Sequence, residues 1–418
     1  MKKDKFLILL TFMFVFAFKI YSIIDSTIIV GGILTAILFI NKDYRKKIYD
    51  MICNKYTYIL IICFLTLIVW SIGTTLINNV RDFTYLKTLV HLCIVIAIGY
   101  ELIAYIDYKN KKSKILNYVI ISFLIQSSLQ WLFFLFPSVS KIFNIFRTEG
   151  MILNNIKYAG YRGLAISSSG FFGLSSAYGL ISILYFTKYN TLFKNNAVKI
   201  LMFLLMFSGT FFAGRTGFVA LPFIFILLMV KAIKNRKEIK RKINKKTILM
   251  SIMCLIFIIL LYVVTFKIPK FAQMYSYAFE LFDNIFSGDG FTTTSTDKLI
   301  AMYNREISPK TFIIGDGKYT DNNSYYMNTD VGYLRKIFYF GILGTIMSFV
   351  LQAILLIKKK DDLYNYLIFL FLIVLELKGE IIGISIIINS IILLYSNTSS
   401  TNEKEQEDGW FNCINDNI

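Results

Sequence analysis

The chain is 418 residues long, with 56% hydrophobic and 17% aromatic residues and a mean hydropathy of +0.60. This composition excludes an ordinary water-soluble domain and predicts an integral membrane protein. The formal net charge of +19 would also suit a nucleic-acid-binding protein, so the positions of the basic residues decide between the two interpretations.

Apolar runs suited to membrane helices follow one another along most of the sequence. A spanning helix needs about 20 mostly apolar residues to cross roughly 30 Å of hydrocarbon. The first run is too long for a signal peptide and no small-x-small cleavage site follows it, so we interpret it as a retained helix. We expect an all-α polytopic protein with about twelve spans, near 6–24, 27–41, 57–78, 85–106, 115–136, 163–186, 200–213, 216–232, 247–267, 331–357, 363–377 and 381–397.

The basic residues gather between these predicted spans. The segments after the second, fourth, eighth and tenth spans are NKDYRKKIYDMICNK, DYKNKKSK, KAIKNRKEIKRKINKK and KKKDD. This positive-inside pattern predicts that both termini lie in the cytoplasm and accounts for the net charge without nucleic acid. The chain then divides into nine spans (1–267), one long outer loop (268–330), three further spans (331–397) and a cytoplasmic tail (398–418).

No pattern in the sequence indicates a metal or a cofactor. The five cysteines have no metal-ligand spacing and fall in apolar or predicted cytoplasmic segments, so neither a zinc site nor a disulfide framework is expected. No Walker motif or other nucleotide signature is present, which argues against an ATP-driven pump.

The outer loop at 268–330 is the place where chemistry in water is expected. It is mildly acidic, and its stretch AQMYSYAFELFDNIFSG has aromatic and aliphatic residues at helical spacing. This spacing predicts a helix that lies in the membrane interface. A second outer segment is expected at 137–162.

Arg215 lies between two apolar arms that are too short to cross the bilayer fully. Each arm has about fifteen residues, which reach roughly 22 Å at 1.5 Å per residue. The apex GRTG is therefore expected below the outer surface, where Arg215 would line an outward-open cavity. The alternative is an arginine that extends to lipid phosphates from a locally thinned membrane.

Arg162 and Arg335 occupy similar places in the predicted topology. Arg162 is at the outer end of the sixth span, and Arg335 is one turn into the tenth. A guanidinium group stays charged in a dehydrated site, and it can donate two parallel hydrogen bonds to two oxygens of one phosphate. Three converging arginines therefore suit a diphosphate at the membrane surface. As single residues, Arg162 and Arg335 could instead be interfacial anchors.

The twelve-span plan, the RTG apex and the loop exit NNSYYMNTDVGYLRKIFYFGILG resemble the Wzy-type O-antigen and capsular polysaccharide polymerases, which are related to the O-antigen ligases. These polymerases are described by an arginine followed by ten residues and a glycine in each of two outer loops. Arg162 and Gly173 have this spacing, although the predicted topology puts most of the motif in a helix. The second copy departs from the pattern, because Asp316 stands where Arg305 would require a glycine.

The resemblance favours a polymerase over a ligase. The ligases carry a histidine in the large outer loop, whereas the only histidine here, His91, lies within the fourth predicted span. A lipid-linked oligosaccharide flippase, or another multi-pass transporter, is the alternative from a different class. Flippases usually have two similar halves and short loops, whereas the long outer loop here occurs once.

The resemblance implies a membrane glycosyltransferase that moves a growing glycan from undecaprenyl diphosphate onto the sugar end of another lipid-linked repeat unit, outside the cytoplasmic membrane. Arginines that neutralise the leaving diphosphate and a carboxylate base would suffice, without a cofactor. Asp330 is the first candidate base and Asp316 the second, although each could be a helix cap or a solvated loop charge. The implied products are O-antigen, capsule or exopolysaccharide, and the expected partners are membrane lipids, a flippase and a chain-length regulator.

Candidate residues for contact with the sugars lie in the outer loop and in the last outward hairpin. Tyrosine rings offer flat faces to sugars but also anchor helices at the interface. The charges of LELKGEIIG could line a sugar channel or pair with one another. The candidates are Arg305, Tyr325, Tyr326, Glu376 and Glu380.

Overall fold

The computed structural model describes residues 2–158, 160–187, 190–193, 195–234, 276, 280, 283–288, 294–321, 324–357 and 363–398. These residues are mostly helical, as expected for an all-α membrane protein. The predicted ninth span at 247–267 and the tail at 399–418 lie outside the described residues.

Helices follow one another along the first half of the chain, interrupted by one short hairpin of β1 (Lys19–Ile20) and β2 (Ile24–Asp25). In order, they are α1 (Lys2–Phe16), α2 (Ser26–Ile40), α3 (Lys42–Ile52), α4 (Lys55–Ile77), α5 (Thr84–Tyr108), η1 (Lys112–Lys114), α6 (Ile115–Leu135), α7 (Pro137–Ile142), η2 (Phe143–Phe146), α8 (Glu149–Lys157), α9 (Phe171–Tyr185), α10 (Asn196–Ala213), η3 (Arg215–Val219) and α11 (Ala220–Lys234).

The C-terminal part combines short elements of the predicted outer loop, named the outer elements, with three further helices. The outer elements are α15 (Thr294–Tyr303), α16 (Pro309–Ile313), the hairpin of β3 (Thr320–Asp321) and β4 (Ser324–Tyr325), and η4 (Tyr326–Asn328). The helices that follow are α17 (Gly332–Leu356), α18 (Leu363–Glu376) and α19 (Ile386–Ser396).

Five of the described helical segments are long and apolar enough to cross a membrane: α4, α5, the η1–α6 segment, α10 and α17. A sixth would be the α2–α3 pair, which is bent by 116° at its break. The helices α9, α18 and α19, together with residues 215–230, are apolar but shorter. The structure therefore supports a membrane-embedded helical protein, while the number of twelve spans stays a prediction.

The largest differences from the predicted spans are in the first and the sixth. The first was expected to reach residue 24, but α1 ends at Phe16, and the hairpin that follows pairs Lys19 with Asp25. The sixth was expected to begin at 163, but the chain is not helical before Phe171. Serines and glycines at 163–170 favour turns over helix, which explains the second error.

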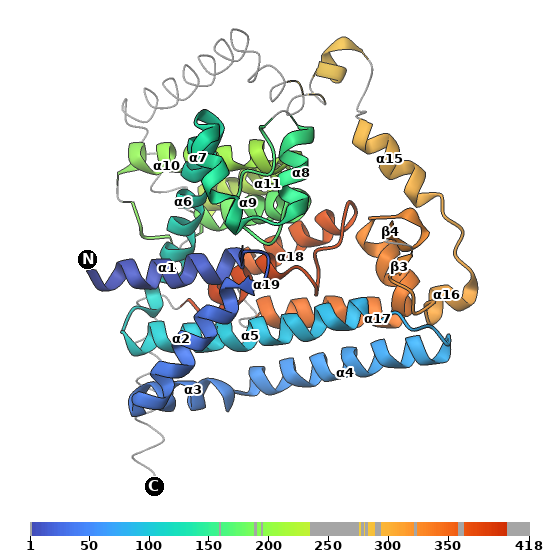
Figure 1. The fold of residues 1–418 in the computed structure, drawn as a ribbon, viewed down its shortest axis with the longest axis horizontal. Coiled ribbons are helices and arrows are strands. Elements are labelled where there is room, and N and C mark those ends of the chain that lie inside the picture. Colours follow the sequence, from blue (N-terminus) through green and yellow to red (C-terminus); the bar gives the residue numbers. More distant parts are fainter. Residues whose placement is uncertain are drawn as a thin grey trace.

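The outer elements rest on the end of a kinked helix. In Figure 1, α4, α5 and α17 lie side by side, with α16, β3 and β4 near one end of α17. The helical geometry of α17 breaks at Phe340 and Gly341, and there the turn after α16 replaces the lost helical bonds. The amides of Asp316 and Gly317 donate to the carbonyls of Phe338 and Tyr339, at 2.7 and 2.9 Å.

Glycine is required on both sides of this junction. Gly341 has φ +67° and Gly315 has φ +86°, a left-handed region that other residues rarely adopt. A side chain at Gly341 would also collide with the carbonyl of Ile313. The kink therefore fixes the outer segment against the membrane helices.

Candidate functional site

Arg162 lies in a loop, which corrects the prediction that most of its motif is helical. The loop at 161–170 leads into α9, and Gly163 in it has φ +71°. The guanidinium is 7% exposed, and its carbon lies 4.6 Å from the ring centre of Tyr158 and 4.9 Å from that of Phe171. Its Nη2 donates to the carbonyl of Ala213 at 2.9 Å, so Arg162 reaches the apex that carries Arg215.

Arg215 begins the short 3-10 turn η3 between α10 and α11, so the predicted break is present. The first arm is longer than the predicted fifteen residues, because α10 has 18 residues and is long enough to cross a membrane. The turn is fixed from α9, because the Ser175 hydroxyl donates to the carbonyl of Gly214 and accepts the amide of Gly217, the latter at 2.7 Å. The Arg215 guanidinium forms an ion pair with Glu280 of the outer segment. Arg162 and Arg215 thus lie near the same apex.

Lys378 joins these arginines from the turn between α18 and α19. Burial lowers its pKa, and the nearby charges of Arg215 and Arg162 lower it further, while Asp330 opposes them. We name Arg162, Arg215 and Lys378 the apex cluster. In the sequence, Lys378 has Glu376 two positions before it and Glu380 two positions after it. These neighbours gave no indication that Lys378 lies near two arginines in the structure.

Asp330 lies between this cluster and the start of α17. Its side chain is exposed at the surface, but the surrounding protein limits its hydration and raises the pKa of its carboxyl group. Lys378 and Arg335 act in the opposite direction, because their positive charges favour the carboxylate. The first candidate base therefore lies near cations from both neighbouring elements.

Arg335 is held on the first turn of α17 between two tyrosine rings. Its guanidinium carbon lies 4.0 Å from the ring centre of Tyr319 and 3.9 Å from that of Tyr325. One guanidinium nitrogen is 3.4 Å from a carboxylate oxygen of Glu380, which also accepts the Tyr319 hydroxyl at 2.6 Å. The Arg335 guanidinium thus contacts protein groups on both faces and at one nitrogen, whereas the sequence suggested that it would be free to bind a diphosphate.

The next residue, Lys336, forms a buried ion pair with Glu376 of α18. Both side chains are 0% exposed, and Lys336 lies 3.6 Å from Glu380 as well. The second oxygen of Glu376 accepts the amides of Ile381 and Ile382, each at 2.8 Å. Glu376 and Glu380 therefore pair with α17, which favours the pairing alternative over an open sugar channel.

We name Arg335, Lys336, Glu376 and Glu380 the paired cluster. It holds two positive and two negative side chains, so its formal charge is balanced.

The short loop between α4 and α5 fixes the tyrosines beside this cluster, because Asp82 accepts the amides of Tyr319 and Thr320 at 2.7 Å each. Burial alone would raise the pKa of Asp82, but these bonds and those from Thr84 lower it below its ordinary range. The sequence analysis did not single out Asp82.

The second candidate base belongs to the structure of the outer segment. Asp316 accepts the Thr311 hydroxyl at 2.7 Å and the Tyr326 hydroxyl at 3.3 Å. The described contacts of Asp316 and Tyr326 thus join them to each other and to α16.

Arg305 is exposed in the loop before α16 and forms no ion pair with the described residues. These three candidates are not joined to the apex cluster by any described contact.

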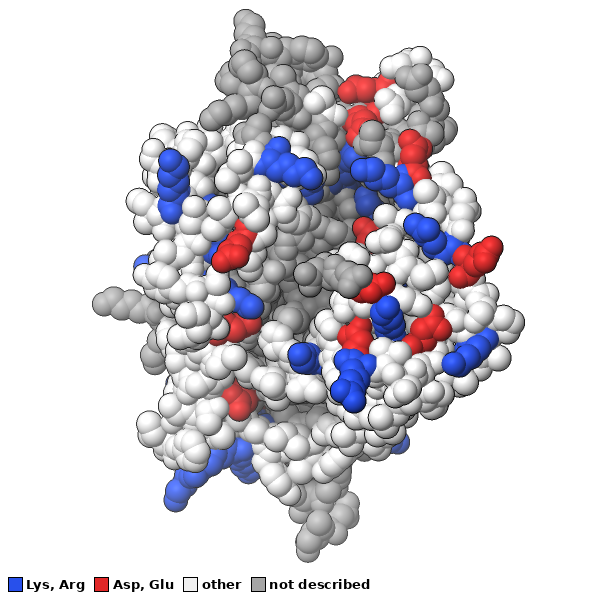
Figure 2. Space-filling view, turned by 45° about the vertical axis from the view of Figure 1, so that its right-hand side comes forward, with Lys and Arg blue, Asp and Glu red and all other residues white. Residues whose placement is uncertain are grey.

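The face that carries the outer elements has charges of both signs. Figure 2 shows acidic and basic side chains next to one another there, rather than a patch of one sign. Among the residues that the structure describes, no group of three His, Cys, Asp or Glu side chains is placed to hold a metal ion. The site is therefore described by its guanidinium, ammonium, carboxylate and phenol groups.

Comparison with known proteins adds no family to this description. The chain matches no protein-family model, no curated protein and no solved structure. Its function is consequently inferred from the chemistry of the two clusters.

Proposed function

We propose that the chain is a polysaccharide polymerase, a membrane glycosyltransferase that joins oligosaccharide repeat units carried on undecaprenyl diphosphate. The observation that carries the proposal is the meeting of Arg162, Arg215 and Lys378, which come from three separate parts of the chain. A diphosphate provides several anionic oxygens, and guanidinium groups bind such oxygens in pairs.

The proposal includes the predicted topology. The chain would span the cytoplasmic membrane about twelve times, with both termini in the cytoplasm and the apex cluster facing outward. A positive group at depth in a membrane costs at least about 2.5–3.5 kcal/mol on insertion scales, so such residues usually mark a site. The ion pair from Arg215 to Glu280 supports this orientation, because Glu280 belongs to the long predicted outer loop.

In the proposed reaction, a hydroxyl oxygen of the acceptor sugar bonds to the anomeric carbon of the donor glycan. The bond from that carbon to the diphosphate oxygen breaks, and undecaprenyl diphosphate leaves with the electron pair. Arg162, Arg215 and Lys378 would stabilise the developing negative charge. For Arg215 this requires its guanidinium to exchange Glu280 for the diphosphate.

Asp330 would accept the proton of the acceptor hydroxyl. Its carboxylate is open to solvent and lies near Lys378, and a pKa raised toward neutrality makes a carboxylate a better base. Asp316 is less suited to this role, because both of its oxygens accept hydrogen bonds from the protein.

The tyrosine rings around Arg335 would contact the sugars. Tyr325 is 48% exposed, and its ring lies against the guanidinium of Arg335. Flat rings of this kind suit the apolar faces of sugars. A flippase that delivers the lipid-linked units and a chain-length regulator are the partners that the proposal requires.

The test is polymerisation by the purified protein in liposomes that contain a lipid-diphosphate-linked repeat unit, with the products separated by size on a gel. We expect a ladder from the wild-type protein and about a 100-fold slower reaction from Arg215→Ala, the typical effect of removing one charge-stabilising group. Arg215→Lys keeps the charge but loses the paired geometry, so its rate should lie between the two.

Arg81→Ala is the matched control, because Arg81 is an exposed arginine in the loop between α4 and α5. It should leave the ladder unchanged. A ladder that persists in Arg215→Ala contradicts the proposed site. Transport of the lipid-linked unit across the liposome membrane without any ladder would favour a flippase, and transfer of a finished glycan to a different acceptor would favour a ligase.

A further inference from the structure

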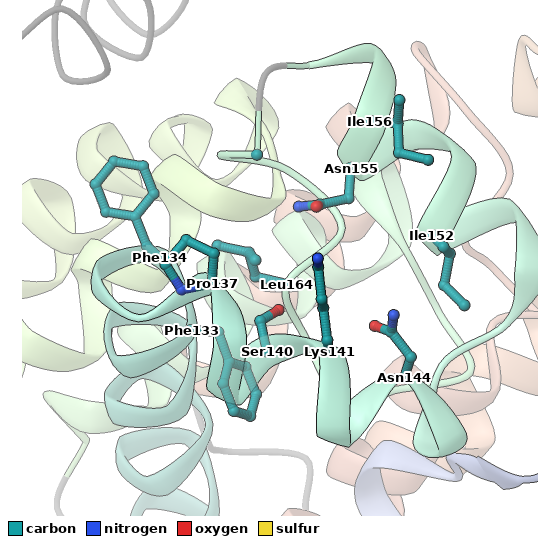
Figure 3. Close-up of a pocket in the computed structure, with 11 residues that line it drawn as sticks. Phe133, Phe134, Pro137, Ser140, Lys141, Asn144, Ile152, Asn155, Ile156 and Leu164 are labelled. Atoms are coloured by element: carbon teal, nitrogen blue, oxygen red, sulfur yellow. The ribbon is translucent and has the colours of Figure 1, made fainter.

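A pocket lies at the end of α6, and none of the residues that line it belongs to either cluster. Its volume is about 210 Å³, and its walls come from the last turn of α6, from α7, η2 and α8, and from Gly160 and Leu164. In Figure 3, Lys141 extends toward Asn155, with Asn144 nearby and Phe133 and Leu164 on the other side. Since one water occupies about 30 Å³ in the liquid, the pocket has room for a group of several atoms.

A buried arginine supports the polar wall of this pocket. Arg147 is 3% exposed, and it donates to the Ser140 hydroxyl at 2.9 Å, to Oδ1 of Asn144 at 3.0 Å and to the carbonyl of Leu164 at 2.7 Å. All three acceptors belong to residues that line the pocket. Because the Asn144 oxygen is used by Arg147, the amide NH₂ of Asn144 is left to donate to a ligand.

The charge of this region is positive. Burial lowers the pKa of Arg147 to about 10, so this side chain is still charged at neutral pH. Neither Arg147 nor the pocket residue Lys141 forms an ion pair within the described part of the chain. A pocket lined by one lysine, with a buried arginine behind its wall and no paired carboxylate, favours an anion.

The position of the pocket indicates that the anion belongs to a lipid. The η1–α6 segment is one of the five candidate spans, and the pocket begins at Phe133 in its last turn, where a spanning helix reaches the headgroup layer. Large apolar side chains beside it are open, with Leu135 56%, Ile142 68% and Ile156 73% exposed. These side chains suit contact with hydrocarbon rather than with water.

We infer that this pocket binds the phosphate group of an anionic membrane lipid. The Lys141 ammonium and the Asn144 amide contact the phosphate oxygens, and Phe133 and Ile156 contact the adjoining hydrocarbon. Arg147 holds the polar wall and adds positive potential from beneath. The inference does not depend on the proposed polymerase activity.

The test is native mass spectrometry of the purified full chain after reconstitution with equal amounts of phosphatidylglycerol and phosphatidylcholine. We expect the wild-type protein to retain phosphatidylglycerol preferentially, and Lys141→Gln to reduce that preference about tenfold, the equivalent of one charged hydrogen bond. Lys157→Gln is the matched control, because Lys157 is an exposed lysine of α8 that does not line the pocket. Lys141→Arg keeps the charge and should keep the preference.

Equal retention of the two lipids by the wild-type protein would overturn the inference, and so would an unchanged preference in Lys141→Gln. A competition experiment separates the two sources of phosphate. Soluble glycerol phosphate should displace the bound lipid poorly, because it lacks the hydrocarbon contacts. Complete displacement at concentrations comparable to the lipid would identify a site for free phosphate esters instead.

Discussion

The apex cluster and the paired cluster are neighbours that use charge in opposite ways. In the paired cluster, Lys336 and Glu376 are fully buried, and the four charges balance within the protein. In the apex cluster, three cations lie together and burial and mutual repulsion lower the pKa of Lys378. Buried charges are stable when paired, whereas a cluster of like charges is strained by mutual repulsion. Arg215 has Glu280 as its ion-pair partner, and Asp330 opposes the lowering of the pKa of Lys378. The paired cluster is therefore the more stable arrangement, and the apex cluster is the one to which the proposed function assigns diphosphate binding.

The largest expected effect is on the paired cluster. Lys336→Ala leaves the Glu376 carboxylate buried without its cation, which should reduce the free energy of unfolding by about 3–5 kcal/mol. The measurement is unfolding in detergent micelles, followed by tryptophan fluorescence. The control is Lys318→Ala, which removes an exposed ion pair with Asp321 and should cost less than about 1 kcal/mol. Equal losses in the two variants would refute the structural role of the paired cluster.

A smaller effect is expected where the loop between α4 and α5 holds the tyrosines of the paired cluster. Asp82→Asn weakens the bonds to Tyr319 and Thr320 and should cost about 1 kcal/mol at neutral pH. The pKa of Asp82 is lowered from its ordinary 3.8, so its stabilisation is present above that pH and is lost as the pH falls below it.

The difference in unfolding free energy between wild type and Asp82→Asn, measured at several pH values, checks this prediction. It should be constant near neutral pH and should shrink below about pH 3.8, the ordinary pKa of the group. A difference that grows on acidification would show that Asp82 is not held as a carboxylate.

The smallest effect, and one of opposite sign, is expected in the apex cluster. Lys378→Gln removes a cation that Arg215 and Arg162 repel, so the free energy of unfolding should rise by less than about 1 kcal/mol. The pKa of Lys378 is lowered from 10.5 in the folded protein, so the charged lysine reduces the free energy of unfolding. This reduction disappears as the pH rises toward 10.5 and Lys378 loses its proton. The gain of the variant over wild type should therefore shrink at alkaline pH. A marked loss of stability in Lys378→Gln would make this lysine structural, as Lys336 is.

The sequence predicted the membrane class and most helix positions, because long apolar runs are a local signal. Outside the undescribed range 247–267, each predicted span overlaps a described helix. The loop around Arg162 was missed because its residues are apolar enough to extend a span, although its serines and glycines favour turns. The break at Arg215 could be predicted because the apolar run is interrupted by GRTG, which is also a local observation.

The remaining site contacts could not be predicted because they join distant parts of the chain. Asp82 and Thr320 are 238 positions apart, and neither has a motif around it. Lys378 lies near two arginines that the sequence places at the ends of other spans. The sandwich of Arg335 depends on β3 and β4, whose four residues show no strand pattern. Such contacts arise from tertiary packing, which one sequence does not encode as a local pattern.

The kink at Gly341 divides α17 into two pieces that contact different parts of the protein. The outer piece, from Gly332 to Phe340, carries Arg335 and Lys336 and is bonded to the turn after α16. The inner piece packs in the bundle, and the Trp70 indole of α4 donates to the Phe340 carbonyl at the boundary, at 2.9 Å. The turn after α16 and the first nine residues of α17 thus form a junction with its boundary at a glycine. Exchange between related chains would therefore preserve this junction if it transferred α16 and this short helical piece together, with Glu376 and Glu380 kept as partners of Arg335 and Lys336.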